Sequence, residues 1–300
     1  MGRPANRVLN GLLDRVGLPL LIAHRGDSFH APENTLEAAR LAHQAGAFAW
    51  ELDVQPTRDG TLVVVHDDSL TRTTDVAVGY QGDPRGKPGF LVRDFDWSEI
   101  ASLDAGSWFV DPAGGPRSAR AFSTLESLSP SWRSELASGR VRIPTLAIAL
   151  ELTRQLDWLV NVEIKACDRN PETLAAQILA EVVHADMADR VLISSFDHAL
   201  VAASAAIPGD HVVGLLSETA EPGIVDHALA LGARTLNLGV EALGKSPDRD
   251  QALLADLAVR GLPLLIYTVN DHGPGGMADH LRELGVSALF TDDPRRGGRP

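Results

Sequence analysis

Short apolar runs alternate with helix-sized segments along the second half of the chain. The runs are WLVNVEIK (158–165), RVLISSF (190–196), HVVGLLS (211–217), ARTLNLG (233–239), LPLLIYTVN (262–270) and SALFTDD (287–293). Residues 171–185 begin with Pro171, a residue favoured at the first helical position, and then carry apolar residues at helical spacing. This alternation predicts parallel strands joined by crossover helices.

Two further apolar runs precede residue 60. They are PLLIAHRG (19–26) and FAWELDVQ (48–55). Between them we expect a helix that starts at Asn34, because Asn34 as N-cap and Glu37 three residues later form a capping-box pattern. Eight parallel strands linked by helices are typical of the TIM (β/α)8 barrel, an α/β fold. We therefore expect residues 1–300 to form one barrel domain.

One connection has no room for a helix. Asp59-Gly60 separates two β-like runs, which predicts a hairpin in which GTLVVVHDD (60–68) is the returning strand. With Asp59-Gly60 as a two-residue loop, the register places Asp53 opposite His66, and Glu51 lies on the same face of the sheet. A short parallel connection would also bring these residues to neighbouring strand ends.

Residues 76–143 do not follow the alternation. They are rich in Gly, Pro and Ser, and we interpret them as an insertion with a helix at 96–103 and a flexible loop at 111–120. The insertion could cap the mouth of the barrel, or it could be a peripheral segment that only adds stability.

The composition is that of an ordinary water-soluble protein, with 44% hydrophobic and 22% charged residues. A formal net charge of −13 argues against partners that need a basic face, so we expect no nucleic acid and no stable membrane insertion. The single cysteine, Cys167, excludes an internal disulfide and is most simply a half-buried thiol. No signal peptide or long apolar span is recognised, which makes cytoplasmic the expected location.

Charged and polar residues gather where the predicted strands end, which is where TIM barrels carry their sites. These residues are His24, Arg25, Glu51, Asp53, His66, Glu163 and Lys165. A purely structural salt-bridge cluster is the alternative, but buried ion pairs are poor stabilisers, so a functional site is favoured.

The residue types in this group suit phosphodiester cleavage. The carboxylates of Glu51, Asp53 and Glu163 provide hard oxygen ligands for one divalent cation, Mg²⁺ or Ca²⁺. The cationic side chains of Arg25 and Lys165 can bind a phosphate. Two histidines, His24 and His66, can divide the proton transfers between the attacking and the leaving oxygen. The residues themselves do not say which histidine is the base.

The segment AHRGDSFHAPENTLEAARLAHQAGAFAWELDVQPTRDGTLVVVHDDSLTRTTD resembles the opening of the glycerophosphodiester phosphodiesterase family. His-Arg-Gly, Pro-Glu-Asn-Thr, Glu-x-Asp and His-Asp occur complete and in order. Later blocks RIPTL, VNVEIK, ISSF, YTVN and FTDDP are also similar, so the resemblance spans residues 20 to 294.

The resemblance implies a TIM barrel with a small insertion after the His-Asp strand, hydrolysing small-molecule glycerophosphodiesters to glycerol 3-phosphate and an alcohol. It implies His24 and His66 as acid–base pair, Glu51, Asp53 and Glu163 as metal ligands, and Arg25 and Lys165 as phosphate ligands. Phe196 and Tyr267 would line a glycerol pocket. Tyr267 stands where the family often has Trp, and the segment 110–141 is longer than expected, so the alcohol is left open.

Three alternatives stay open at this point. The nearest is a lysophospholipase D or phospholipase that cleaves a lipid phosphodiester. A non-catalytic phosphate-binding module and a carboxylate-metal barrel with isomerase or lyase chemistry belong to other functional classes. The oligomeric state is not indicated by the sequence.

Overall fold

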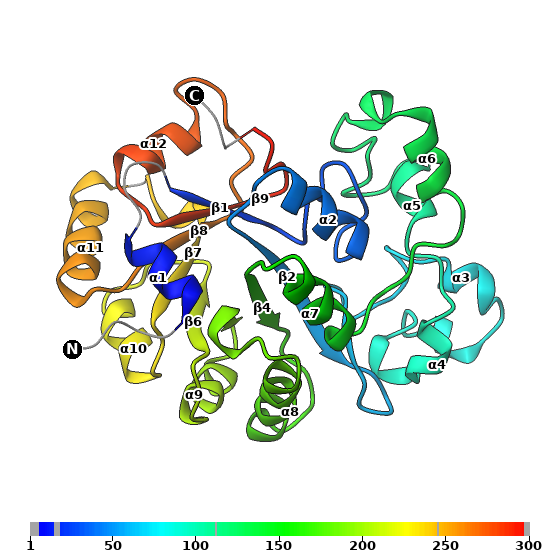
Figure 1. Cartoon of the computed structure of the whole chain (residues 1–300), viewed down its shortest axis with the longest axis horizontal. Helices are drawn as coiled ribbons and strands as arrows, with labels where there is room; N and C mark the ends of the chain where they lie inside the picture. The colour runs from blue at the N-terminus through cyan, green and yellow to red at the C-terminus, as the bar shows by residue number, and fades with distance from the viewer. Residues whose placement is uncertain (1–5, 15–18, 112, 245, 297–300) are drawn as a thin grey trace.

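The computed structural model describes residues 6–14, 19–111, 113–244 and 246–296, so the ends of the expected 1–300 domain lie outside it. Eight parallel strands form a closed barrel, because β1 pairs with both β9 and β2 (Figure 1). The barrel strands are β1 Leu20–Ala23, β2 Ala49–Pro56, β4 Val160–Ile164, β5 Val191–Ser195, β6 Val212–Ser217, β7 Thr235–Gly239, β8 Leu264–Tyr267 and β9 Ala288–Thr291. The predicted TIM barrel is confirmed.

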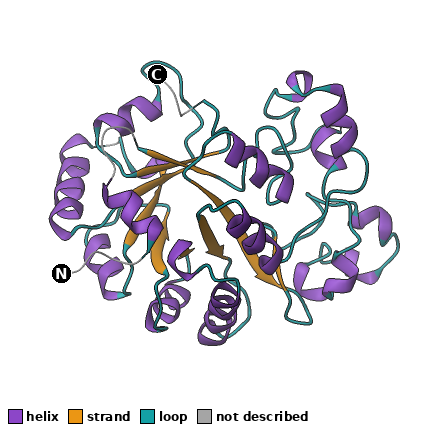
Figure 2. Cartoon of the chain, viewed as in Figure 1, coloured by secondary structure: helices purple, strands orange, loops and turns teal. Residues whose placement is uncertain are grey.

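Helices surround the barrel (Figure 2). They are α1 Arg7–Asp14, α2 Leu36–Gln44, α7 Leu146–Gln155, α8 Pro171–His184, α9 His198–Ala206, α10 Ile224–Ala230, α11 Pro247–Arg260 and α12 Met277–Glu283, with short 3-10 helices η4 Ala188–Arg190 and η5 Val240–Ala242. Val160, Val162 and Ile164 of β4 are buried in the layer between the barrel and these helices. The intervening polar residues of β4 therefore face the inside of the barrel.

The hairpin exists, but its predicted register is wrong by one residue. Strand β3, Leu62–Val64, is antiparallel to β2 and pairs Val54 with Val64. The Thr57 amide donates to the Thr61 carbonyl at 2.9 Å, so the loop has three residues and ends at Gly60, whose φ is +86°. Asp53 therefore lies opposite Val65, not His66.

The start of α2 also differs from the prediction. Thr35, not Asn34, is the N-cap, and its hydroxyl accepts a hydrogen bond from the Ala38 amide at 3.2 Å. Asn34 adopts a left-handed conformation with φ +61°, and its side chain points to another partner. Asn34, a residue type that favours N-cap positions, therefore bonds to Asp53 instead of capping α2.

The N-terminal helix α1 packs against the barrel end opposite the strand C-termini. Its buried residues Val8, Leu9 and Leu12 share one apolar cluster with Ile22, Leu159, Leu192 and other residues near the strand starts. That end is filled with side chains, which leaves the other end of the barrel for a site.

The insertion has an apolar core of its own and lies beside the barrel (Figure 1). Its helices are α3 Val76–Gly79, α4 Trp97–Ile100, α5 Ser107–Val110 and α6 Pro130–Leu136, with η1 Pro84–Gly86, η2 Val92–Asp94 and η3 Leu125–Ser127. The expected helix at 96–103 is the shorter α4. In the expected loop at 111–120, Ser118 and Ala119 are fully buried, and Arg117 reaches residues of the barrel mouth. This contact favours a cap over a purely peripheral segment.

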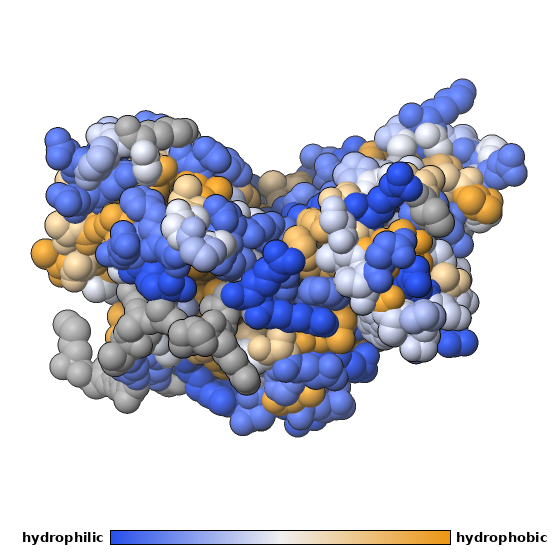
Figure 3. Space-filling view, turned by 90° about the horizontal axis from the view of Figure 1, so that it is seen from above, coloured by the Kyte–Doolittle hydropathy of each residue, from blue (hydrophilic) through white to orange (hydrophobic). Residues whose placement is uncertain are grey.

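The described helices include none with the length and apolar character needed to cross a bilayer. Figure 3 shows mainly hydrophilic residues on the face seen from above, with smaller hydrophobic areas between them.

Candidate active site

Three carboxylates meet at the C-terminal ends of two adjacent strands. Strand β2 contributes Glu51 and Asp53, and β4 contributes Glu163, which is the register partner of Asp53. Each offers an oxygen, and these oxygens all lie within 4.8 Å of one another. Glu51 and Asp53 are each only 1% exposed.

The environment of these carboxylates fits a cation. Burial, together with the charges of Asp53 and Glu163, raises the pKa of Glu51 well above its usual value. Among the described residues, neither Glu51 Oε1 nor Asp53 Oδ1 has a hydrogen-bond partner. Buried carboxylate oxygens without partners are costly, and a bound divalent cation would satisfy them. The set of three oxygens suits Ca²⁺ or Mg²⁺.

Two cationic side chains border the same group. Lys165 Nζ lies 2.6 Å from Glu163 Oε1 and 3.4 Å from Asp53 Oδ1. Arg25 Nε lies 3.2 Å from Asp53 Oδ2, and its backbone amide donates to Glu51 Oε2 at 2.8 Å. Burial acts to raise the pKa of Asp53, but Arg25 and Lys165 outweigh it and hold that pKa below its ordinary value.

The His-Arg-Gly turn has a geometric reason. Arg25 and Gly26 both have positive φ, +57° and +84°. A Cβ on Gly26 would lie 2.6 Å from the backbone carbon of Ala38, so only glycine fits between this turn and α2. The turn aims the Arg25 amide at Glu51.

Asn34 fixes the orientation of Asp53. Its Nδ2 donates to Asp53 Oδ2 at 2.8 Å, and its Oδ1 accepts from the Asp53 amide at 3.1 Å. The sequence did not reveal this role, because Asn34 followed by Glu37 also fits the pattern of a helix cap.

His24 is held by a carboxylate from the last strand end. Its Nδ1 lies 2.8 Å from Asp292 Oδ1. Asp292 also accepts hydrogen bonds from Ser28 at 2.9 Å, Asn270 at 2.7 Å and Arg117 of the insertion at 2.7 Å. Neither Asp292 nor Arg117 was identified from the sequence, although Asp292 lies within the quoted FTDDP block.

His66 has a carboxylate partner of its own. Its Nδ1 lies 2.6 Å from Asp67 Oδ1, and Arg72 Nε donates to Asp67 Oδ2 at 2.6 Å. Although His66 is not the register partner of Asp53, it lies close enough to contribute to lowering the pKa of both Asp53 and Glu163. The hairpin therefore still brings the imidazole to the carboxylates.

One buried carboxylate links both histidine networks. Glu33 accepts from Arg25 at 2.8 Å, Arg72 at 2.7 Å and Arg117 at 2.7 Å. Burial acts to raise the pKa of Glu33, but the charge of Arg25 and its other cationic partners hold it well below the usual value. Glu33 was quoted in the Pro-Glu-Asn-Thr motif without a role.

The two aromatic residues expected in the pocket contact each other at the barrel mouth. The rings of Phe196, after β5, and Tyr267, at the end of β8, pack edge to face with centroids 5.8 Å apart. Phe196 is 40% exposed, and burial together with the Glu218 carboxylate raises the pKa of Tyr267. This arrangement offers an apolar surface that solvent and a ligand can reach.

Comparison with known proteins agrees with this geometry. The model of the glycerophosphoryl diester phosphodiesterase family matches residues 24–296. The chain belongs to this family. The phosphodiesterase is 31% identical to the glycerophosphodiester phosphodiesterase of Caldanaerobacter subterraneus subsp. tengcongensis, across 93% of this chain and 99% of the relative.

Two further relatives cover nearly the whole phosphodiesterase. The glycerophosphodiester phosphodiesterase of Bacillus altitudinis is 28% identical, across 92% of this chain and 95% of its own. A phosphodiesterase of Oleispira antarctica, solved with the product sn-glycerol-3-phosphate, has a TM-score of 0.72 at 28% identity and covers 93% of this chain and 95% of that one. The prediction of a phosphoric diester hydrolase is confirmed.

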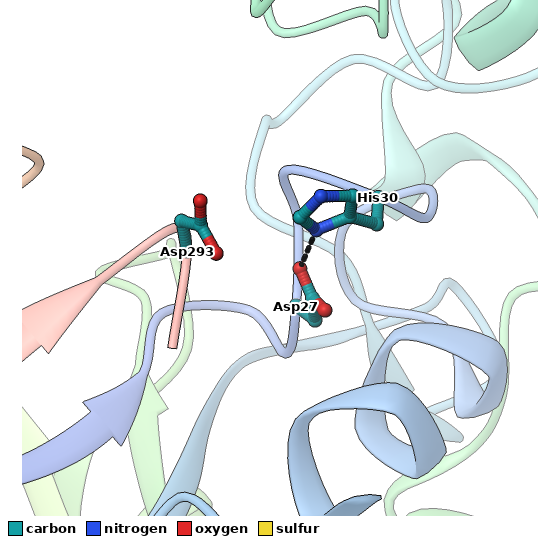
Figure 4. A group of neighbouring side chains, drawn as sticks. All are labelled: Asp27, His30 and Asp293. Carbon is teal, nitrogen blue, oxygen red and sulfur yellow. Dashed lines mark hydrogen bonds and ion pairs between the residues drawn. The ribbon is translucent and has the colours of Figure 1, made fainter. Parts of the chain in front are cut away.

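A second group of possible ligand atoms in the phosphodiesterase has a structural explanation. Asp27, His30 and Asp293 approach one another, and His30 bonds to Asp27 at 2.7 Å (Figure 4). Each carboxylate is also paired with a guanidinium, Asp27 with Arg295 at 2.8 Å and Asp293 with Arg296 at 3.0 Å. The Asp27–Arg295 pair ties the last described residues to the loop after β1, whereas the Asp293–Arg296 pair lies within the C-terminal segment.

Proposed function

We propose that the phosphodiesterase hydrolyses glycerophosphodiesters to glycerol 3-phosphate and an alcohol with one divalent cation, Ca²⁺ or Mg²⁺, and a His24–His66 acid–base pair. The observation that carries this proposal is a pair of buried carboxylate oxygens, Glu51 Oε1 and Asp53 Oδ1, without hydrogen-bond partners among the described residues, beside two imidazoles that each have a carboxylate of their own. The product bound to the Oleispira antarctica relative is sn-glycerol-3-phosphate, which supports the choice of substrate.

Glu51, Asp53 and Glu163 would hold the cation. When bound, the cation supplies positive charge to the phosphate oxygens and makes phosphorus easier to attack. Arg25 and Lys165 bind non-bridging phosphate oxygens and neutralise charge that develops on them. Phe196 and Tyr267 contact the glycerol carbons and exclude water from that side.

His24 acts as the base. Asp292 accepts a hydrogen bond from Nδ1–H of His24, which leaves Nε2 free to accept a proton from the attacking oxygen. Burial and the neighbouring charges of Arg25 and Arg117 lower the pKa of His24, although Asp292 acts in the opposite direction. A lowered pKa keeps the imidazole neutral, as a base requires.

His66 acts as the acid. Asp67 fixes the orientation of the ring through Nδ1, so that Nε2 can donate a proton to the leaving alcohol oxygen. The new oxygen–phosphorus bond forms as the bond between phosphorus and the alcohol oxygen breaks. The proton lost to His24 and the proton given by His66 balance.

The attacking oxygen belongs to the glycerol 2-hydroxyl or to water. Attack by the hydroxyl gives a cyclic phosphate that water then opens, and it requires a substrate with that hydroxyl. A 2-deoxyglycerol phosphodiester separates the two routes: it is inert on the cyclic route, and its turnover at the rate of the parent substrate would exclude that route.

The proposed function is tested by measuring release of glycerol 3-phosphate from glycerophosphocholine and glycerophosphoethanolamine, with detergent-dispersed lysophosphatidylcholine in parallel. We expect release from the two water-soluble esters. Cleavage of the lysolipid alone would overturn the proposal in favour of a lysophospholipase D. Isomerisation of a sugar phosphate without ester cleavage would indicate the other barrel chemistry.

Replacing Asn34 with alanine is expected to weaken cation affinity by about 10–100-fold, the usual cost of losing a residue that orients a metal ligand. The amide holds Asp53 through two hydrogen bonds, and alanine makes neither. Isothermal titration with Ca²⁺ and Mg²⁺ gives the affinity. Asn6→Ala is the control, because buried Asn6 bonds to the Val191 and Asp210 carbonyls near strand starts. Equal losses in both variants would show a general effect of destabilisation.

Replacing Arg117 with alanine is expected to shift the acidic limb of the kcat/KM profile to higher pH. His24 works unprotonated, and the Arg117 charge contributes to lowering its pKa, so removing that charge raises the pKa and leaves more imidazolium at a given acidic pH. On the acidic limb the rate should fall, while on the plateau above it the rate should change much less. Arg117→Lys should restore part of the shift.

The control for this experiment is Arg133→Ala on α6, whose nearest carboxylate, Glu126, is 3.9 Å away. A uniform loss of rate in Arg117→Ala without movement of the acidic limb would mean that Arg117 supports only the fold of the insertion.

A further inference from the structure

A cleft of about 200 Å³ lies where the end of β2, the loop after β4 and the insertion meet. Its lining includes Gln55 and Pro56 from β2, Leu91 and Arg93 from the insertion, and Cys167 and Arg169 from the loop after β4. None of these residues has a role in the chemistry described above.

The walls of the cleft continue the segments that carry the site. Gln55 follows Asp53 by two residues on the same strand, and Ala166, also in the lining, directly follows Lys165. The Gln55 side-chain amide donates to the carbonyls of Val65, His66 and Asp67 at 3.1, 3.0 and 2.9 Å. This amide joins the cleft wall to the segment that holds His66. The cleft is therefore next to His66 and Lys165.

The aromatic pair lies on a different part of the barrel mouth. Phe196 follows β5 and Tyr267 ends β8, whereas the cleft is built on β2 and β4. A phosphodiester has two arms, and a phosphate held by Arg25 and Lys165 would send one arm toward each of these places. On the proposed function, the glycerol arm contacts Phe196 and Tyr267.

We propose that this cleft is the subsite for the leaving alcohol, and that it takes a neutral polyhydroxy alcohol such as a second glycerol. The proposal rests on the proposed function. It also agrees with the proposed roles of the two histidines, because His66, the proposed acid that protonates the leaving alcohol, is the imidazole beside the cleft.

The charges in the cleft favour a neutral polar group. The lining has two cationic side chains, Arg93 and Arg169, and two anionic ones, Asp68 and Asp168, so the formal charges cancel. Arg93 lies 3.4 Å from Asp168, and Arg169 donates to the Thr57 carbonyl at 3.0 Å. Guanidinium and carboxylate groups together can donate to and accept from hydroxyl groups.

The lining disfavours a quaternary ammonium group. Such groups are recognised mainly by aromatic faces, and no aromatic ring lines the cleft within the described chain. Pro56, Leu91 and Ala166 instead give a small apolar wall that suits the carbon chain of a polyol.

The single cysteine of the chain provides the test, because Cys167 is in the lining and is half-buried. The enzyme is treated with methyl methanethiosulfonate at alkaline pH, since burial raises the pKa of the thiol. kcat/KM is then measured for three esters of glycerol 3-phosphate, with glycerol, choline or methanol as the leaving alcohol. Each ester is compared with itself before and after treatment, so differences in leaving-group acidity cancel.

We expect modification to lower kcat/KM for the glycerol ester by about tenfold and to change that for the methyl ester by less than about twofold. Before modification, the glycerol ester should be the better substrate than the choline ester. In Cys167→Ser, the reagent should change none of the three values. Arg169→Ala should reproduce the selective loss on the glycerol ester without any reagent.

Equal losses on the glycerol and methyl esters, or no loss on either, would overturn the subsite. A choline ester that is cleaved faster than the glycerol ester would overturn the class of alcohol. If none of the three esters is cleaved, the methyl ester included, the result would instead contradict the proposed function on which the subsite depends.

Discussion

Replacing His66 with alanine is expected to lower kcat for glycerophosphocholine by about 10²–10⁴-fold, the usual contribution of a positioned acid. Without the imidazole, the alcohol oxygen leaves as an alkoxide, which is a far poorer leaving group than an alcohol. The side chain is partly exposed beside Asp67, so the substitution opens no buried cavity and should not change the fold. The rate of glycerol 3-phosphate release measures the loss.

A substrate with a better leaving group shows whether His66 is the acid. A p-nitrophenyl ester of glycerol 3-phosphate needs no proton on its leaving oxygen, so His66→Ala should cleave it with a much smaller loss. An equally large loss on both esters would contradict the assignment. His280→Ala is the matched control, because His280 is an exposed residue of α12.

Removing the cation with EDTA is expected to abolish activity, and either Ca²⁺ or Mg²⁺ is expected to restore it. Glu51→Gln should weaken cation binding by more than about 100-fold, because a lost ligand costs more than a lost supporting residue. A neutral amide also removes a carboxylate whose burial is unfavourable when no cation is bound. The cation-free variant should therefore be as stable as the cation-free wild type or more stable.

Thermal unfolding with and without the cation separates these effects. A ligand that binds only the folded state raises Tm, so added cation should raise the Tm of the wild type and leave that of Glu51→Gln nearly unchanged. Full activity after exhaustive EDTA treatment would contradict the metal site. Equal rises in Tm for the two proteins would place the cation elsewhere.

The barrel could be predicted because its strands are buried on both faces and its helices on one. Such strands appear in the sequence as short apolar runs, and residues such as Pro171 mark helix starts. The carboxylates and histidines of the site could be picked out because charged groups at the ends of apolar runs are costly to bury unless they are paired or bind a ligand. The structure places them near the strand ends as the pattern predicts, except that His66 is displaced by one residue in the hairpin register.

What the sequence could not provide are contacts that depend on three-dimensional packing. Asp292 is 268 residues away from His24, and Arg117 belongs to a segment without a periodic pattern. Asn34 was predicted as the N-cap of a helix but binds Asp53 instead, and the turn at Asp59-Gly60 was predicted with two loop residues but has three. Local propensity does not reveal which distant residue a polar side chain will bind.

The triple contact at Glu33 connects the surroundings of the two histidines. A single carboxylate accepts hydrogen bonds from Arg25, from Arg72, which also bonds to Asp67 beside His66, and from Arg117, which also bonds to Asp292 beside His24. Opening of the insertion would withdraw Arg117 from both Glu33 and Asp292, so Glu33 would lose one cationic partner and the carboxylate that holds His24 would lose another. We therefore expect partial unfolding of the insertion to lower activity while the barrel is still folded, because the insertion supplies Arg117 to the site.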